Sequence, residues 1–221
     1  MHLRQLVRFT SVMFLFLPAW SATAGPMGFQ DSWMSMGDLG PNWREVFANY
    51  ALTPRDAVGV SQTYMRADDD SVSRDLTELT YTRLLKRWNQ RDAQANVWFV
   101  GGVGEIRLHD RDKNRDSHRA AISPGIQIDY ETTRIYFSAI HRLYRAADIN
   151  HDYSALRAGF SFFETDYEST QPWLILEARS MNALSDQIEL TPMLRLINRR
   201  YFIEGGVNNF GQPRFNFMFI F

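Results

Sequence analysis

Nine charged side chains lie in segments where every second residue is apolar. They are Arg119, Asp129, Arg157, Glu177, Arg179, Glu189, Arg195, Glu204 and Arg214. In an extended chain, alternation of this kind places all of the charges on one face. Two kinds of chemistry fit such a face. A ladder of arginines could line a water path that favours small anionic solutes. Alternatively, the opposite charges could pair and fill an interior, because an unpaired interior charge is costly.

The histidines and serines form no recognisable catalytic pattern. Three histidines have an aspartate within two residues in polar segments, where a solvated charge cluster is expected: His109, His118 and His151. His141 shares an apolar strand face, and Ser138, three residues away, lies on the opposite face. No G-x-S-x-G motif is present. We therefore predict that the protein is not an enzyme, with an enzyme that modifies lipid or lipopolysaccharide as the alternative.

Methionines gather near the N-terminus, at Met27, Met34 and Met36. Thioethers are soft ligands that suit Cu(I), so these residues are candidates for a metal site. Met34 and Met36 would also share one strand face, and methionine fills irregular apolar space well. Both interpretations stay open, and we predict no cofactor.

The composition excludes several classes of protein. The 221 residues include no cysteine, which excludes a disulfide scaffold, a thiol nucleophile and a zinc ribbon. Lys and Arg total 24 against 25 Asp and Glu, so there is no basic excess to follow a phosphate backbone, and we expect no nucleic-acid partner.

The first 24 residues have the layout of a secretory signal peptide. Arg4 and Arg8 precede an apolar stretch at 12–20, and Ala22 and Ala24 provide the small side chains of a cleavage site. The apolar stretch is shorter than the ~20 residues that a transmembrane helix needs. We predict cleavage after Ala24, which leaves 25–221 as one domain.

The rest of the chain alternates with a period of two. In 119–130 all six even positions are apolar, and the odd positions are mostly polar. The same pattern predicts eleven strands: 43–52, 57–66, 75–86, 94–106, 119–130, 134–145, 153–162, 171–181, 187–197, 201–208 and 214–221. Pro124 and Pro192 lie inside predicted strands and each removes a ladder hydrogen bond, so we expect local bulges there.

The connections between these strands fall into two classes that alternate along the chain. Short turns alternate with longer polar connections at 67–74, 108–118, 146–152 and 209–213. This arrangement is typical of an all-β, antiparallel up-and-down transmembrane barrel, which has an even number of strands in bacteria. The stretch 27–38 would supply a twelfth strand. Ten strands is the alternative, if that stretch does not pair and one weaker strand is a loop.

Aromatic residues at the strand ends, full charges in mid-strand and the C-terminal strand together favour a membrane barrel over a soluble one. In the C-terminal strand the alternate residues are aromatic and the last residue is Phe: Phe215, Phe217, Phe219 and Phe221. This strand resembles the insertion signal of outer-membrane β-barrel proteins of Gram-negative bacteria. The resemblance implies a location in the cell outer membrane and insertion by the barrel-assembly machinery, with outer-membrane lipid and lipopolysaccharide as neighbours.

Four stretches also resemble uncharacterised proteobacterial outer-membrane proteins. They are PMGFQDSWMSMGD, PNWREVFANYALTPRDAVGV, INHDYSALRAGFSF and TPMLRLINRRYFIEGGVNN. Those proteins are loosely associated with copper or heavy-metal resistance clusters, so the resemblance implies a link to metal resistance and supplies no site residue. From the residues themselves, we expect either a small passive pore or a plugged structural barrel.

Overall fold

The computed structural model describes residues 25–110, 115–166 and 169–221. The predicted signal peptide and its cleavage site lie outside the described residues. The strand segments are β1 Trp33–Leu39, β2 Trp43–Ala51, β3 Asp56–Arg66, β4 Val72–Asn89, β5 Ala93–Asp110, β6 Arg115–Ile122, β7 Gly125–Thr132, β8 Ile135–Ala146, β9 Ile149–Phe160, β10 Gln171–Met181, β11 Glu189–Asn198, β12 Tyr201–Val207 and β13 Pro213–Ile220. The described residues contain no helix that could cross a membrane.

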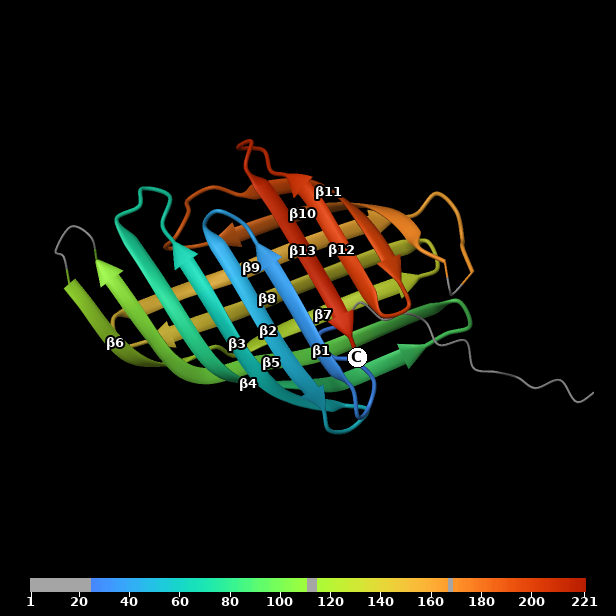
Figure 1. Cartoon of the computed structure of the whole chain (residues 1–221), viewed down its shortest axis with the longest axis horizontal. Coiled ribbons are helices and arrows are strands. Elements are labelled where there is room, and N and C mark those ends of the chain that lie inside the picture. Colours follow the sequence, from blue (N-terminus) through green and yellow to red (C-terminus); the bar gives the residue numbers. More distant parts are fainter. Residues whose placement is uncertain (1–24, 111–114, 167–168) are drawn as a thin grey trace, which may run out of the picture.

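The strands close into one antiparallel barrel (Figure 1). Apart from β6 and β7, which both lie between β5 and β8, each strand pairs with its neighbours in chain order, and β1 pairs with β13 to close the ring. β6 and β7 are two halves of one strand, because β5 pairs Val103 with Ile122 and Val100 with Gly125 in a single register across Pro124. The predicted twelve-strand barrel is therefore confirmed.

The two prolines do not cause the bulges that we expected. At Pro124 the strand is interrupted, yet the register on β5 and β8 is unchanged on both sides. Pro192 pairs with Leu176 of β10, while the ladder to β12 begins one residue later, at Met193. The missing N–H of Pro192 lies at the edge of that ladder, and Asn209 N donates to the Leu190 carbonyl oxygen at 2.9 Å in the same register. The register shift in the described ladders lies elsewhere, between Leu84 and Lys86.

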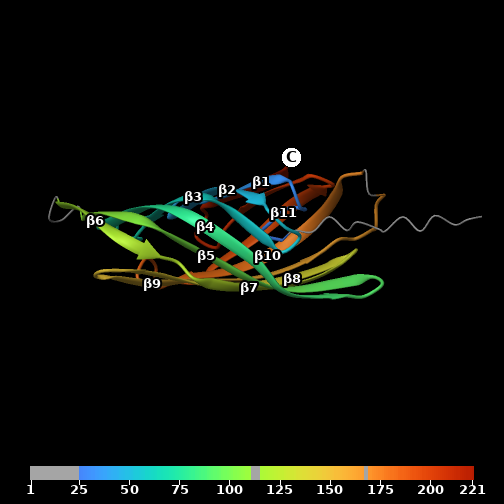
Figure 2. The ribbon, with the colours of Figure 1, turned by 90° about the horizontal axis from the view of Figure 1, so that it is seen from below.

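The barrel is flattened, so that two walls face each other (Figure 2). β1, β2 and β3 lie on one wall, and β7, β8 and β9 lie on the other. The start of β1 and the C-terminus meet at one end of the barrel, where Trp33 and Phe221 exchange backbone hydrogen bonds of 2.8 and 2.9 Å. We call this the terminal end, and the opposite one the far end.

The connections at the far end are shorter than the sequence pattern predicted. β4 and β5 continue as strands to Val72 and Asp110, and the turn between β8 and β9 is only 147–148. Contacts between β5 and β6 stabilise this longer hairpin: the Asp116 carboxylate of β6 accepts from both Arg107 and His109 of β5. The outward face of this hairpin is polar, with Arg107, His109 and Asp116, whereas Ile106 and Leu108 face inward. It therefore lacks the apolar outward face of the other strands, and the predicted strands stopped short of it.

The predicted twelfth strand starts later than expected. Pairing begins at Trp33, and residues 25–32 instead turn into the terminal end of the barrel. Asn49 Nδ2 donates to the Pro26 carbonyl oxygen at 2.9 Å. Met27 is 4% exposed and packs in a buried cluster that includes Ala51 and Trp98. We call residues 25–32 the N-terminal cap, because they fill this mouth of the barrel.

The two faces of the wall differ in polarity. Large apolar side chains cover the outside, including Val60, Leu79, Val103, Ile128, Phe137, Leu156, Leu176 and Leu194. Phe215, Phe219 and Phe221 are exposed on the outside as well, and Phe217 lies against Gly37 there. The inside carries the buried polar and charged residues. This apolar-out, polar-in arrangement is that of a transmembrane barrel.

Candidate functional site: the ion-paired interior

The nine predicted charges all lie at inward positions of their strands. Six of them are at most 3% exposed: Glu177, Arg179, Glu189, Arg195, Glu204 and Arg214. Arg157 and Asp129 are mostly buried, and Arg119 lies near the far end, with Nη2 at 3.8 Å from Asp148 Oδ2. Strand alternation alone puts them there, because every second side chain of a barrel strand points inward.

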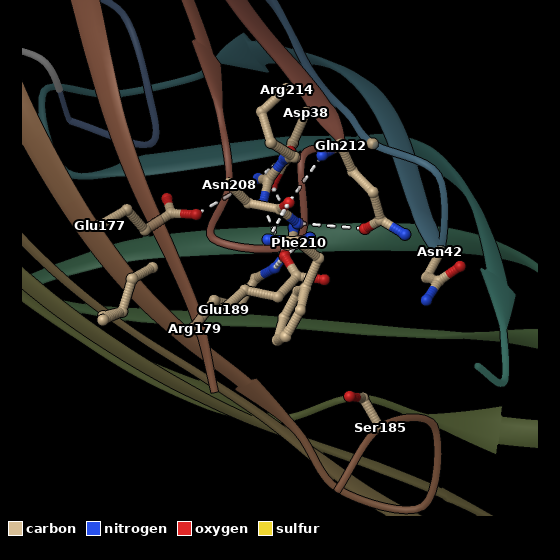
Figure 3. Close-up of polar contacts among 12 residues, drawn as sticks. Asp38, Asn42, Glu177, Arg179, Ser185, Glu189, Asn208, Phe210, Gln212 and Arg214 are labelled. Atoms are coloured by element: carbon tan, nitrogen blue, oxygen red, sulfur yellow. Dashed lines mark hydrogen bonds and ion pairs between the residues drawn. The ribbon is translucent and has the colours of Figure 1, made fainter. Parts of the chain in front are cut away.

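Two arginines and two carboxylates form a cluster near the far end (Figure 3). Arg179 Nη2 donates to Glu189 Oε2 at 2.5 Å, and Arg214 Nη1 donates to the same oxygen at 3.1 Å. The Asp38 carboxylate pairs with the same two arginines. Its Oδ1 lies 2.6 Å from Arg214 Nη2, and its Oδ2 lies 3.4 Å from Arg179 Nη1. Each cation therefore lies between two anions, and each anion between two cations.

A second cluster continues toward the middle of the barrel. Glu204 accepts hydrogen bonds from Arg157 and Arg195, and also from Asn216 Nδ2 at 2.8 Å. Arg157 Nε lies 3.0 Å from Glu177 Oε2. Arg214 Nη2 lies 3.2 Å from the other oxygen of Glu177, which joins the two clusters.

Together the two clusters make one network, which we call the ionic lattice. It consists of Asp38, Arg157, Glu177, Arg179, Glu189, Arg195, Glu204 and Arg214. Its four cations and four anions balance. Buried charges are tolerated when they are paired and hydrogen-bonded in this way, and removing one member leaves an uncompensated charge.

One further arginine bridges the two walls. Arg142 of β8 donates through Nη1 to Glu45 of β2 at 2.9 Å, and through Nη2 to Glu78 of β4 at 3.2 Å. The same Nη2 reaches Ser123 Oγ at 2.8 Å. Because β8 and β2 lie on opposite walls (Figure 2), these contacts cross the lumen. We call them the cross-lumen bridge.

Asp129, one of the predicted lumen residues, has a different role. Its two carboxylate oxygens accept hydrogen bonds from Asn96 Nδ2 and Trp98 Nε1, both at 2.6 Å. The indole of Trp98 packs against the N-terminal cap, close to Gly25 and Met27. Asp129 therefore positions the ring that holds the cap.

Four charged residues of the ionic lattice and the cross-lumen bridge were not identified from the sequence. They are Asp38, Glu45, Glu78 and Arg142. The signal for Arg142 was present, since an outward His141 implies an inward neighbour. Asp38 is the last residue of the predicted twelfth strand, 27–38, and Glu45 lies in the predicted strand 43–52.

A serine and a histidine do make contact, on the outside of the barrel. His141 Nδ1 lies 2.8 Å from Ser154 Oγ, across β8 and β9. Ser138 is inward-facing, as the sequence predicted. Among the contacts of the described residues, none joins His141 to a carboxylate, so the pair lacks the third member that orients a catalytic histidine.

The three methionines lie in different surroundings. Met27 belongs to the cluster around Trp98, whereas Met34 is buried with Phe202, Met218 and Ile220, and Met36 packs beside that second cluster. Across the described ranges, no group of three or more His, Asp or Glu side chains could hold a metal ion. The Cu(I) site stays a prediction.

No family model and no curated protein matches this chain. Among solved structures, the KdgM porin is similar at 10% identity and a TM-score of 0.47, and the KdgM porin in complex with disordered oligogalacturonate at 10% and 0.46. A loop L8 deletion mutant of OmpT, an outer membrane protein of Vibrio cholerae, is similar at 8% and 0.31. Each similarity covers 86% of this chain and 98% of the other chain.

Proposed function

We propose that the protein is an outer-membrane barrel with a closed interior, a plugged barrel rather than an open diffusion pore. The apolar outer face supports a location in a bilayer, because lipid must contact that face. The predicted signal peptide and the Phe-terminated β13 support export and insertion by the barrel-assembly machinery. Outer-membrane lipid and lipopolysaccharide would then surround the wall.

The observation that carries the closed interior is the ionic lattice together with the cross-lumen bridge. Eight paired charges extend across the lumen from Asp38 of β1 to Arg157 of β9, and Arg142 of β8 pairs with Glu45 of β2. Water in an open channel would hydrate these groups and would leave them exposed, yet most are almost fully buried. The N-terminal cap closes the terminal end in addition.

The absence of cysteine makes a direct test simple. Ser61 is buried on the inside of β3, and Ser71 lies in the exposed connection between β3 and β4. We would introduce Ser61→Cys or Ser71→Cys as the single thiol and measure its labelling by a charged, water-soluble reagent in the folded protein. A closed interior predicts labelling of Ser61→Cys at least a hundredfold slower than of Ser71→Cys. Comparable rates would show a water-filled lumen and would overturn the proposal.

A second candidate is a small passive pore for anionic solutes. Three arginines, Arg142, Arg157 and Arg195, line the remaining space in the interior, which favours this reading. An open pore would require the N-terminal cap and the cross-lumen bridge to move out of the lumen. Stable, anion-selective current steps from the wild-type protein in a planar bilayer would support it over the plugged barrel.

A further inference from the structure

A buried apolar cluster lies across the far end of the lumen. The ring centre of Trp43 on β2 lies 5.6 Å from that of Tyr144 on β8 and 4.7 Å from that of Tyr153 on β9, so these rings join the two walls. Further members come from the far-end parts of other strands: Met65, Leu76, Ile106, Ile149 and Met181. We call this cluster the apolar seal.

One member of the apolar seal comes from a connection instead of a strand. Leu184 lies in residues 182–188, the β10–β11 loop, and its side chain is buried in the seal. Most of this loop is exposed, including Asn182, Ala183 and Ile188. A segment with so little buried apolar surface can open locally at a small fraction of the free energy that unfolds the barrel.

The β10–β11 loop crosses the mouth of the barrel. The Leu184 carbonyl oxygen accepts a hydrogen bond of 3.0 Å from the backbone N–H of Asp68, which lies in the connection between β3 and β4. In the closed ring of strands β3 and β10 lie on opposite sides, with β6 and β7 taken as one strand. Asn42 Nδ2 donates to Asp68 Oδ1 at 2.5 Å and so fixes the receiving side.

The two sides of the loop are held differently. On the β10 side, Asn182 N donates to the Asp152 carbonyl oxygen at 3.2 Å, and the Asn182 side-chain oxygen accepts from Asp152 N at 2.5 Å. On the β3 side the loop is held through Leu184, by its carbonyl oxygen and its side chain. The Asn182 contacts are therefore suited to a hinge, and Leu184 is suited to a latch.

The residue between hinge and latch has a strained backbone. Ala183 has a φ of 57°, in the left-handed region, which is unfavourable for a residue with a Cβ. The other non-glycine residues with positive φ in the described ranges are Asp31, Asp70 and Asp148, and an aspartate tolerates this region better. Such strain persists only while the surroundings hold the residue, so release of Leu184 would relieve it.

We propose that the β10–β11 loop is a lid that opens and closes the far end of the lumen, with Leu184 as its latch. Opening withdraws Leu184 from the apolar seal and leaves the strands paired. The longer connections of outer-membrane barrels face the cell exterior, so the lid controls access from outside. The lid rests on the proposed closed interior, because it adds a movable closure to a lumen that the ionic lattice and the cross-lumen bridge close further down.

A single thiol beneath the lid reports its opening. Met65 is 0% exposed and belongs to the apolar seal, so Met65→Cys is labelled by a charged, water-soluble reagent only when the seal opens. In this background Leu184→Ala should speed labelling at least tenfold, because the buried leucine side chain stabilises only the closed lid. Ile188→Ala is the matched control and should leave the rate within about twofold, since Ile188 lies in the same loop but is 60% exposed. A heat-dependent gel shift confirms that each full-length mature variant is folded.

A second variant tests the strain. Glycine adopts positive φ without penalty, so Ala183→Gly should favour the closed lid and slow the labelling of Met65→Cys about threefold or more. An unchanged or faster rate would contradict the role of Ala183 in the lid.

Ser61→Cys, deeper in the lumen on the same strand, separates the lid from the closed barrel. It should stay slowly labelled when Leu184→Ala is added. Equal labelling of Met65→Cys with and without Leu184→Ala would overturn the lid, and so would equal acceleration of both thiols, because that reports opening of the whole barrel. Fast labelling of Ser61→Cys in the otherwise unchanged protein would overturn the closed interior instead, and the comparison at Met65→Cys would still decide the lid.

Discussion

Glu204 is the residue on which the ionic lattice depends most. It accepts hydrogen bonds from Arg157, Arg195 and Asn216, and it is 1% exposed. The replacement Glu204→Gln keeps the shape and removes one charge, so four cations face three anions. The amide oxygen of the new glutamine can accept from one arginine. Its NH₂ group, which is itself a donor, then faces the other arginine. Breaking a buried ion pair by removing one partner costs about 3–5 kcal/mol, and we expect a loss of that size.

The free energy of unfolding in detergent, measured with a denaturant and followed by heat-dependent gel mobility, is the assay. Glu105→Gln is the control, because Glu105 is exposed on the outside and its ion pair among the described residues is with His118, which is exposed as well. It should change stability by less than about 1 kcal/mol, as exposed pairs do. A second variant, Glu204→Leu with Arg195→Leu, removes a cation and an anion together and should regain part of the loss. A loss below about 1 kcal/mol for Glu204→Gln would mean that water screens these charges, and the closed interior would be refuted.

The remaining predictions concern the wall and its assembly. A Cβ at Gly104 would lie 1.9 Å from the Thr77 carbonyl oxygen of the neighbouring strand, whereas one at Gly205 would meet nothing within 4 Å. Gly104→Ala should therefore abolish or strongly weaken folding, and Gly205→Ala should leave the denaturation midpoint within error; similar midpoints would contradict this packing. Phe221 is 58% exposed on the outside, so Phe221→Ala should change the stability of the purified barrel little. Its yield in the outer membrane of cells should fall several-fold if β13 carries the insertion signal, and an unchanged yield would argue against that signal.

The strands could be predicted wherever one face is apolar and the other polar. Around 119–130 the alternation gave the correct face for every residue from Ala120 to Tyr130, because a lipid-facing wall repeats with a period of two. It failed at the far end of β5 and β6, where the outward face of the hairpin is polar instead of apolar. It also failed for 27–32, the first part of the predicted twelfth strand, which instead turns at the mouth of the barrel, with Met27 buried beside Trp98.

The inward positions of the nine charges could be predicted, but their partners could not. Asp38 and Arg214 are 176 residues apart, and Arg142 and Glu45 are 97 apart. Whether such residues meet depends on the register of every intervening strand and on the flattening of the barrel. Neither quantity is encoded in a local pattern, so the sequence left pairing and an open arginine ladder as alternatives.

Single-channel conductance tests the central claim most directly. The refolded mature protein, shown to be folded by its gel shift, is placed in a planar bilayer under a salt gradient. The ionic lattice, the cross-lumen bridge and the N-terminal cap together predict a silent membrane. Stable current steps with a defined reversal potential from the wild-type protein would contradict a closed interior.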